Sequence, residues 1–535
     1  MTTFAKNIKV FVKTQWFVFF LLVFAALRLI NLKSGYIWFD DTATIGGINK
    51  IPWPNLFGEV LNHTTNAVTG PFLPTLLSRI IVNLFGPDIL LLRLPDFIIS
   101  ILSIILFKKY VLSKIFSSQS IQFLVLIAIC FSIPFILYSQ SIQPSIYYFF
   151  SSIVQFGIFL SLWREIRSLD SLGKLNKKVL LFGLISTPLF LVNYMSVIVF
   201  FILLGTLLMY FLHQVLKNKL ALKKLISFSL YALLGSIPYL ALTYWRLGGD
   251  ETYIRQYFEG SYYVNGLTDI FKLIYDTVSY LFNFAYTLNL YRPLGYNLLS
   301  APFLLLVILG LIDLIYKNRK LWLIFVYILM IFAALSIFKI IPLGGVRHIL
   351  IFAPFIFVFF GMGLHKLGLI VISKFKGQKF INTTLAVILI TYILTIFMTS
   401  GKYVYLHRQS AVDLNKIVKF ANQYSVKSIL DLESYDQLSI IDYSNGKILK
   451  KNGLSIYPLD KKSCPDIMES YLLVAYHYPL DPKWNFPLPD NCLTKFNIGT
   501  LEENLGNLDQ STIAQSIYYP QNGFFIYIIQ SISNL

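Results

Sequence analysis

Charged residues are scarce in this sequence. Only 13% of its 535 residues are charged and 56% are hydrophobic, whereas about 25% of the residues of soluble globular proteins are charged. The shortage excludes an ordinary soluble globular domain. Continuous apolar runs of roughly 18–22 residues, each long enough to cross a bilayer, recur along the first 400 residues. The runs do not alternate with polar residues as the strands of a membrane barrel do, so we expect an all-α polytopic membrane protein.

Cysteines are equally few. Cys130 falls inside an apolar run, and the other two, Cys464 and Cys492, lie in the more polar C-terminal region. If that region lies in an oxidising compartment, a disulfide between these two would suit it, although two cysteines do not establish one. The sequence also shows no internal repeat, no nucleotide-binding motif and no interrupted span with charges at mid-membrane, and these absences argue against a transporter.

Basic residues exceed acidic residues, and the formal net charge is +19. In a soluble protein this excess would suggest a nucleic-acid partner. Here the basic residues cluster in short loops between apolar runs, where they set the orientation of the spans, so we expect no nucleic acid. Lys6, Lys9 and Lys13 precede the first run and place the N terminus in the cytoplasm. That run lacks a small-residue cleavage site, which predicts an uncleaved anchor.

The apolar runs predict eleven spans. They lie near residues 16–30, 95–112, 122–138, 145–163, 179–193, 196–213, 225–245, 298–316, 321–338, 349–370 and 380–400. The basic segments then fall on one side, the cytoplasm: FKKYVLSK, WREIRSLDSLGKLNKK, LKNKLALKKL, YKNRK and SKFKGQK. The opposite side receives the loops 33–94 and 246–297, the turns YSQSIQPS and IPLGGVRH, and everything after residue 401.

The chain divides into two predicted domains. Residues 1–400 form a membrane domain of about eleven helices, and its outer loops 33–94 and 246–297 contribute to the active site. Residues 401–535 are more polar, with helical periodicity over 411–424 and short strand-like runs in SILDLES, YLLVAYH and GFFIYIIQ. We expect them to form a small α/β domain, which is extracytoplasmic because the number of spans is odd.

Two acidic residues, Asp40 and Asp41, stand side by side in the first outer loop within YIWFDD. On a helix, adjacent side chains diverge by about 100°, so the two carboxylates would take different roles. One would face a reacting centre, and the other would bind a backbone group, an arginine or a cation. The simpler alternative is a helix N-cap before Thr42. Acidic groups at a membrane are often functional, which favours the catalytic interpretation.

Basic residues occur at two other outer positions. Arg93 and Asp96 flank Pro95 at the expected mouth of the second span, where proline is tolerated in a first helical turn. Arg347 and His348 follow two glycines before the tenth span. Arginine binds phosphate with paired hydrogen bonds, and glycine amides can assist; interfacial anchoring is the alternative role of both arginines. Carboxylates and arginines on one side of the membrane predict a phosphorylated lipid substrate.

These motifs together resemble the GT-C superfamily, and within it the bacterial branch that includes the lipid A aminoarabinose transferases and relatives of the protein O-mannosyltransferases. WFDD resembles the acidic pair of that branch's first outer loop, with Asp40 as its aspartate and Asp41 in place of its glutamate. GPFLPTLLSRIIVNLFG resembles an aromatic- and proline-rich segment that leads into a leucine-rich helix. The resemblance extends over about residues 16–400.

Further motifs follow in the same order, with some departures. RLP, beginning at Arg93, resembles an Arg-Leu-Pro at the second span, and RH, beginning at Arg347, resembles a basic pair before a late span. Where the branch often has Gln-Glu-Ala-Arg-Pro-Tyr, this chain reads SQSIQPSIYY, with Ser141 and Gln143 at the glutamate and arginine positions. Asn193 stands where the branch commonly has histidine. These replacements keep open an inactive relative that serves as a scaffold.

The resemblance implies a glycosyltransferase of the bacterial inner membrane. Such enzymes take a sugar from a polyprenyl-phosphate donor, usually undecaprenyl phosphate, and pass it with inversion to an acceptor hydroxyl on the extracytoplasmic face. The acceptor would be a glycolipid, a glycan or a protein, and the sequence specifies neither it nor the sugar. A membrane transporter of a lipid-linked or sugar substrate is the competing class.

The resemblance also implies roles for individual residues. Asp40 would take the proton of the acceptor hydroxyl, a contribution of about 10²–10⁴-fold. Asp41 would orient a neighbour or hold a divalent cation, and the sequence leaves metal dependence open. The donor phosphate would be bound by Arg347, His348 and Arg93. The substrate cleft would be lined by Gln143, Asn193, Tyr262 and Tyr263, although tyrosine is also common at membrane interfaces.

Overall fold

A computed structural model describes most of the predicted spans and the strands of the C-terminal part. The described residues are 2–30, 32–33, 52–56, 71–142, 145–168, 172–217, 222–247, 274–275, 277–283, 301–317, 322–337, 347–374, 394, 396–398, 401, 414–423, 427–431, 442–443, 446–458, 471–476, 513–519 and 524–529. They fall into two compact units. The helical unit comprises Met1–Leu29, Trp53–Leu76 and Pro95–Val404, and the C-terminal unit comprises Ile30–Pro52, Leu77–Leu94 and Tyr405–Leu535.

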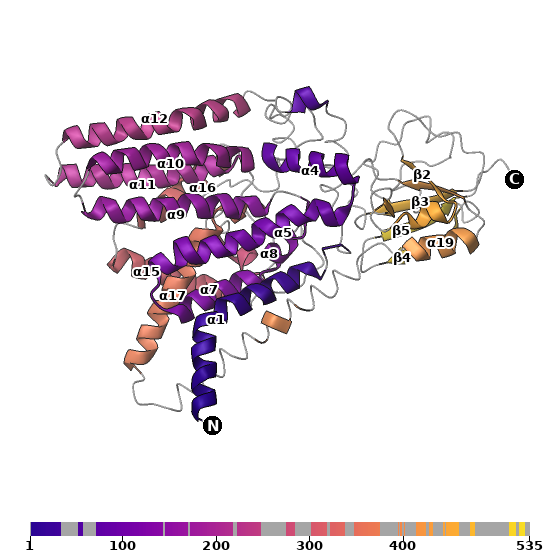
Figure 1. Cartoon of the computed structure of the whole chain (residues 1–535), viewed down its shortest axis with the longest axis horizontal. Helices are drawn as coiled ribbons and strands as arrows, with labels where there is room; N and C mark the ends of the chain where they lie inside the picture. Colours follow the sequence, from indigo (N-terminus) through magenta and orange to yellow (C-terminus); the bar gives the residue numbers. More distant parts are fainter. Residues whose placement is uncertain are drawn as a thin grey trace. The chain divides into compact units, whose positions relative to one another are not determined.

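Long apolar helices build most of the first unit, because a backbone in lipid must satisfy its hydrogen bonds within its own helix. The helices are α1 (Thr2–Leu29), α4 (Phe72–Phe85), α5 (Ile89–Leu106), α6 (Ser113–Ile115), α7 (Gln119–Phe131), α8 (Ile133–Tyr138), α9 (Ile146–Ser168), α10 (Leu172–Val192), α11 (Ser196–Leu216), α12 (Leu222–Leu247), α15 (Ala301–Lys317), α16 (Trp322–Ile337) and α17 (Ala353–Lys374). Shorter segments are η1 (Trp53–Asn55), the π-helical η2 (Phe107–Leu112) and η4 (Arg347–Ile351). Helices α9 to α12 lie side by side in Figure 1.

Among the described residues, six helices are long and apolar enough to cross a membrane, so the protein is a helical membrane protein. They are Ile89–Ile115, Ile146–Glu165, Leu175–Val192, Ser196–Leu216, Leu222–Tyr244 and Ala353–Val371. Each of the first ten predicted spans overlaps a helix of the structure. The eleventh, 380–400, lies mostly outside the described residues, so the total of eleven stays a prediction.

The expected start of the second span is wrong. Helix α5 begins at Ile89, so Pro95 lies inside the helix and not in its first turn. The reason is the cap at Asp88, whose Oδ1 accepts a hydrogen bond of 3.0 Å from the amide of Leu91. An aspartate that binds an amide three residues later is a typical helix start. Pro95 removes one interior hydrogen bond, which membrane helices tolerate where their surroundings satisfy the freed carbonyl.

The third predicted span, 122–138, is not one continuous helix. The third span divides into α7 and α8 at Ser132, whose ψ of 122° is extended. Pro134 lies in the first turn of α8 and has no amide hydrogen to donate to Cys130, four residues before it. The guanidinium of Arg28 takes that place: Nη1 and Nη2 lie 3.4 and 3.3 Å from the carbonyl oxygen of Cys130. Arg28 is fully buried, and it also lies over the ring of Phe24, 3.4 Å from its centroid.

Two further hydrogen bonds fix the break. Ser132 Oγ donates to the carbonyl of Leu281 at 2.7 Å, and the amide of Ile133 donates to the carbonyl of Asn283 at 2.8 Å. The segment 277–283 therefore caps the start of α8, since the amides of a first helical turn lack partners within their own helix. Because 277–283 lies within the predicted outer loop 246–297, these bonds tie that part of the loop to the bundle.

Aromatic rings fill the centre of the bundle. Phe135 lies 4.9 Å from Phe149 and 5.7 Å from Phe357, in both cases edge to face. These contacts join α8, α9 and α17. Edge-to-face pairs are the preferred aromatic geometry and fix the relative rotation of the helices that carry them.

Glycines bring two helix pairs into backbone contact. A Cβ at Gly363 of α17 would overlap the carbonyl oxygen of Leu306 on α15, and one at Gly310 would overlap that of Phe359. Gly183 of α10 and Gly235 of α12 face one another in the same way. Small residues allow membrane helices to approach closely, which supplies packing where lipid gives no hydrophobic driving force.

The C-terminal unit contains a five-stranded sheet of order β2-β1-β3-β5-β4. Its strands are β1 (Ser428–Asp431), β2 (Ser455–Pro458), β3 (Tyr471–Tyr476), β4 (Ile513–Tyr519) and β5 (Phe524–Ile529). β1 pairs in parallel with β2 and β3, whereas β5 is antiparallel to β3 and β4. Two helices, α19 (Leu414–Gln423) and α21 (Ile448–Lys451), accompany the sheet. Asp442 holds α21, because its Oδ1 accepts a hydrogen bond of 2.7 Å from the amide of Leu449.

The elements expected in this region are present at α19, β1, β3 and β5, and β2 and β4 were not expected. The domain boundary at residue 401 and a location outside the membrane stay predictions. Cys464 and Cys492 lie outside the described residues, and the described cysteine, Cys130, is free and buried.

Candidate functional site

The structure describes part of the predicted site. Outside the described residues lie Asp40, Asp41, Gln143, Tyr262 and Tyr263. Arg347 begins η4, but its side chain is also outside the description. The roles expected of Asp40 and Arg347 therefore stay predictions. The predicted residues whose side chains can be placed are Arg93, Asn193 and His348.

Arg93 is buried in the C-terminal unit, with 1% of its surface exposed. Its Nη1 donates a hydrogen bond of 3.3 Å to the carbonyl of Leu32. The side chain therefore ties α5 to the segment that follows α1. A fully buried arginine does not snorkel to water as an interfacial anchor would.

Asp96, also on α5 and part of the helical unit, is 3% exposed. The hydroxyl of Tyr147, in the first turn of α9, hydrogen-bonds to its carboxylate. A carboxylate buried among apolar helices is costly unless it is partnered, and ionisable residues at such positions are usually functional. The Asp96–Tyr147 pair is therefore a candidate for proton handling at the start of α9.

A second face of α9 carries four polar residues: Tyr148, Ser151, Ser152 and Gln155. We call them the α9 polar stripe. Their spacing of three, four and seven residues places them above one another on one side of the helix. Tyr148 is half-buried, whereas the other three are fully buried. The stripe thus leads from a partly accessible end into the interior of the bundle.

The outer half of the stripe contacts the turn between α10 and α11. Asn193 Nδ2 donates a hydrogen bond of 3.1 Å to Ser151 Oγ, which in turn donates one of 3.1 Å to the carbonyl of Tyr148. Asn193 Oδ1 accepts a hydrogen bond of 3.0 Å from the amide of Met195. Asn193 therefore shapes the short turn and also contacts the stripe.

Aromatic residues form the rim of the stripe. The rings of Tyr148 and His348 lie 5.6 Å apart, edge to face, so η4 is held against α9. Tyr194 is a further neighbour of Tyr148. Burial, with Tyr148 as a second cause, raises the pKa of the Tyr194 hydroxyl well above its ordinary value, so this hydroxyl stays neutral.

The inner end of the stripe faces α11 and α12. The amide of Gln155 lies beside the hydroxyl of Tyr239, which is hydrogen-bonded to Ser196. The Tyr239 ring stacks on Phe200, with centroids 5.0 Å apart. Tyr239 and Ser196 are both fully buried. The result is an uncharged polar cluster enclosed by aromatic rings.

These polar groups share one end of the bundle. They occupy the start of α9, the turn between α10 and α11, the last two turns or so of α12, and η4. The basic loops predict that all of these ends are extracytoplasmic.

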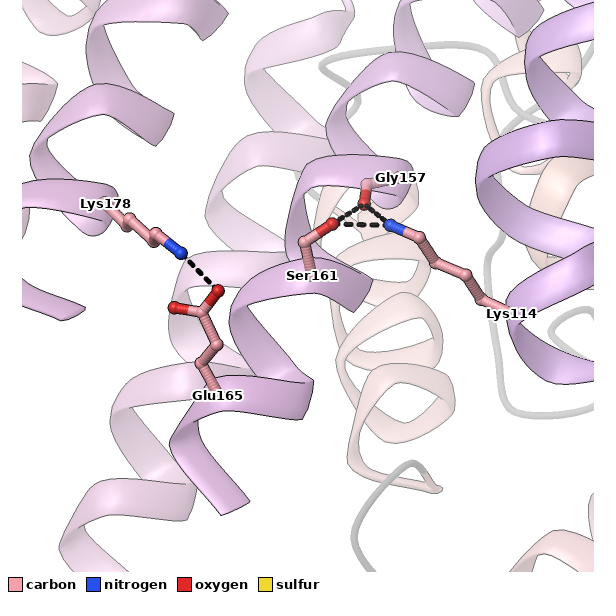
Figure 2. Close-up of polar contacts among 5 residues, drawn as sticks. All are labelled: Lys114, Gly157, Ser161, Glu165 and Lys178. Carbon is pink, nitrogen blue, oxygen red and sulfur yellow. Dashed lines mark hydrogen bonds and ion pairs between the residues drawn. The ribbon is translucent and has the colours of Figure 1, made fainter. Parts of the chain in front are cut away.

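Polar contacts further along α9, toward its C-terminal end, differ in kind. In Figure 2, Lys114 donates to the carbonyl of Gly157, at 3.1 Å, and to Ser161, and Lys178 pairs with Glu165. The side chains of Lys178 and Glu165 are 47% and 38% exposed. Such an exposed pair contributes little to stability, and its position agrees with a helix end at the membrane surface.

Within the described part of the chain, no three histidine, cysteine, aspartate or glutamate side chains gather as metal ligands would. Asp41, the expected cation ligand, is outside that part, so the divalent cation stays an open prediction.

The sequence did not single out the α9 polar stripe, because its residues lie inside a predicted span and outside the loops and turns where a site was expected. The information was present in YYFFSSIVQF, where Tyr148, Ser151, Ser152 and Gln155 interrupt an apolar span at helical spacing. Tyr239 and Ser196 could not have been identified, since nothing local marks them. No protein-family model and no curated protein matches the chain, so the site depends on its own geometry.

Proposed function

We propose that this protein is a membrane glycosyltransferase that moves a sugar from a polyprenyl-phosphate donor to an acceptor hydroxyl on the extracytoplasmic face. One observation carries the proposal. Buried polar and ionisable side chains from α5, α9, α11 and α12 gather at helix ends that the basic loops predict to be extracytoplasmic. Polar groups inside a membrane protein commonly mark substrate sites, and the resemblance of its motifs to the GT-C superfamily supplies the reaction.

The reaction needs a base and an anion-stabilising group. The acceptor oxygen attacks the anomeric carbon while the Asp40 carboxylate takes its proton. The bond between that carbon and the donor phosphate oxygen breaks, and its electron pair leaves with the lipid phosphate. Arg347, with His348, stabilises the charge that develops there. The Asp96–Tyr147 pair near the start of α9 is a further candidate for handling a proton.

Transport remains a second candidate because of the broken span. Discontinuous helices with buried charges are typical of transporter sites, and α7, α8 and Arg28 have this arrangement. However, Arg28 binds the carbonyl that Pro134 leaves without a partner. The break therefore has a local structural cause, and we favour the enzyme.

The test uses purified protein in lipid nanodiscs with undecaprenyl phosphate that carries a labelled sugar. Release of undecaprenyl phosphate with appearance of a labelled product supports the enzyme. Binding without turnover supports a scaffold, and in vesicles, movement of label without bond cleavage supports a transporter. The Asp40→Asn variant is the control for turnover, because it removes the base and keeps the size of the side chain.

A further inference from the structure

The most unusual group in the bundle is Gln155. Its side chain is fully buried. The hydroxyl of Tyr239 interacts with this amide in the described structure, but one hydroxyl serves only one end of it, so at least one of the two amide atoms lacks a partner. Ser152, one turn nearer the outer end of α9, is also fully buried with an unpaired hydroxyl.

A buried amide with an unsatisfied donor or acceptor is destabilising. The surrounding apolar side chains offer no hydrogen-bonding partner. A leucine at position 155 would pack there without the free-energy cost of burying an amide. Unpaired buried groups in a folded protein therefore call for an explanation, and a ligand that supplies the missing donor and acceptor is one. Gln155 and Ser152 together offer a donor and acceptors on two successive turns of one helix face.

The chemistry of this region is neutral. The stripe and its neighbours provide an amide and hydroxyls, with the rings of Tyr239 and Phe200 stacked alongside. The buried carboxylate of Asp96 is bonded to Tyr147, which lies on a different face of α9 from Tyr148. An apolar and aromatic lining with a few uncharged polar groups suits a polyhydroxylated ring.

Exposure decreases along the stripe. Tyr148 and His348 at the rim are half-buried, and Ser151, Ser152 and Gln155 beneath them are fully buried. Tyr148 and Gln155 are separated by about 10 Å along the helix axis, at 1.5 Å per residue.

We infer that the α9 polar stripe binds the sugar of the lipid-linked donor and selects an uncharged ring, with Gln155 and Ser152 as its hydrogen-bonding groups. The inference rests on the proposed function. It adds the substrate class: a donor with a neutral hexose, and not one with a cationic aminosugar.

The test compares two leucine substitutions. In Gln155→Leu a buried amide with an unsatisfied atom is removed together with its contact to Tyr239, so the unfolding temperature should change little. Gln122→Leu is the matched control, because buried Gln122 donates a hydrogen bond of 2.7 Å to the carbonyl of Phe116 near the opposite end of the bundle. This control should lower the unfolding temperature and leave donor binding unchanged.

Binding is measured with three probes: undecaprenyl phosphate, undecaprenyl-phosphate mannose and undecaprenyl-phosphate aminoarabinose. The wild-type protein should bind the mannose lipid more tightly than the other two. Gln155→Leu should weaken binding of the mannose lipid about tenfold, equivalent to one hydrogen bond, and leave binding of the sugar-free lipid unchanged.

The outcomes separate the inference from the proposed function. If the wild type binds none of the three lipids, the proposed function fails. If it binds and transfers mannose but Gln155→Leu binds the mannose lipid as well as the wild type, only the inference is overturned. A preference for the aminoarabinose lipid, or an equal loss for the sugar-free lipid, overturns it as well.

Discussion

The close contact between α15 and α17 predicts that replacing glycine by alanine has opposite effects on stability at two positions of α17, Gly363 and Gly368. At Gly363, an added Cβ would overlap the carbonyl oxygen of Leu306 and lie 2.7 Å from its carbonyl carbon and 3.1 Å from its Cα. All three are backbone atoms, so no side chain can rotate away. Gly368, five residues further along α17, has nothing within 4 Å of such a Cβ.

The expected magnitudes follow from packing and helix propensity. Alanine is favoured over glycine inside a helix by about 0.8–1.0 kcal/mol, so Gly368→Ala should stabilise the protein by up to that amount. At Gly363 alanine would bring the same gain in helix propensity, but its Cβ would force α15 and α17 apart. Overpacking costs about 1–3 kcal/mol, and a gap of 0.5–1 Å forfeits about a quarter to a half of each dispersion contact along the interface. Gly363→Ala should therefore be destabilising.

The assay is thermal unfolding of the purified protein in detergent. A change of 1 kcal/mol shifts the midpoint of a 150–250-residue domain by about 2–4 °C, so the two variants should move in opposite directions by a measurable amount. All scans need the same heating rate, since unfolding of such proteins is commonly irreversible. If Gly363→Ala is as stable as Gly368→Ala, the two backbones are not in contact and the packing of this helix pair is wrong.

The remaining predictions concern the break in the third span and the proposed chemistry. Arg28→Leu leaves the Cys130 carbonyl without its donors and should destabilise the protein by at least about 1–3 kcal/mol; an unchanged unfolding midpoint would show that the guanidinium is dispensable. Asp40→Asn should abolish sugar transfer while the yield of folded protein stays the same, and full activity would end its assignment as the base. Arg347→Ala should raise the KM for the lipid donor most strongly, whereas an unaltered donor dependence would leave this arginine only an anchoring role.

The positions of the helices were largely predictable, because an apolar run in lipid has no alternative to a helix. The errors occur where a short-range interaction overrides hydropathy. Asp88 caps α5 earlier than the apolar run suggested, and Pro134 divides the third span at Ser132. Both residues were visible in the sequence, and both carry recognisable helix-terminating or helix-starting chemistry. Arg28, which compensates the break from a different helix, could not have been inferred from local sequence.

The candidate site was predictable in part. Asn193 and His348 were singled out through a family resemblance, and they contact Ser151 and Tyr148 of the same stripe. Their contribution to donor binding stays a prediction. Gln155 was not predicted, because a single uncharged polar residue hardly changes the hydropathy of an apolar span. Its spacing from Tyr148, two helical turns, is the signal that could have identified it.

Two consecutive residues at the start of α9, Tyr147 and Tyr148, lie in different chemical environments. Tyr147 bonds to the buried carboxylate of Asp96, and Tyr148, rotated by about 100° on the helix, packs against His348 above the neutral stripe. Sugar transfer from a lipid phosphate needs both environments next to each other: ionisable groups for the proton and the leaving phosphate, and uncharged groups for the ring. A slip of α9 by one residue would exchange these faces, so its rotation must be fixed. The packing of Phe156 against Phe355, with ring centroids 4.6 Å apart, fixes it two turns below the rim.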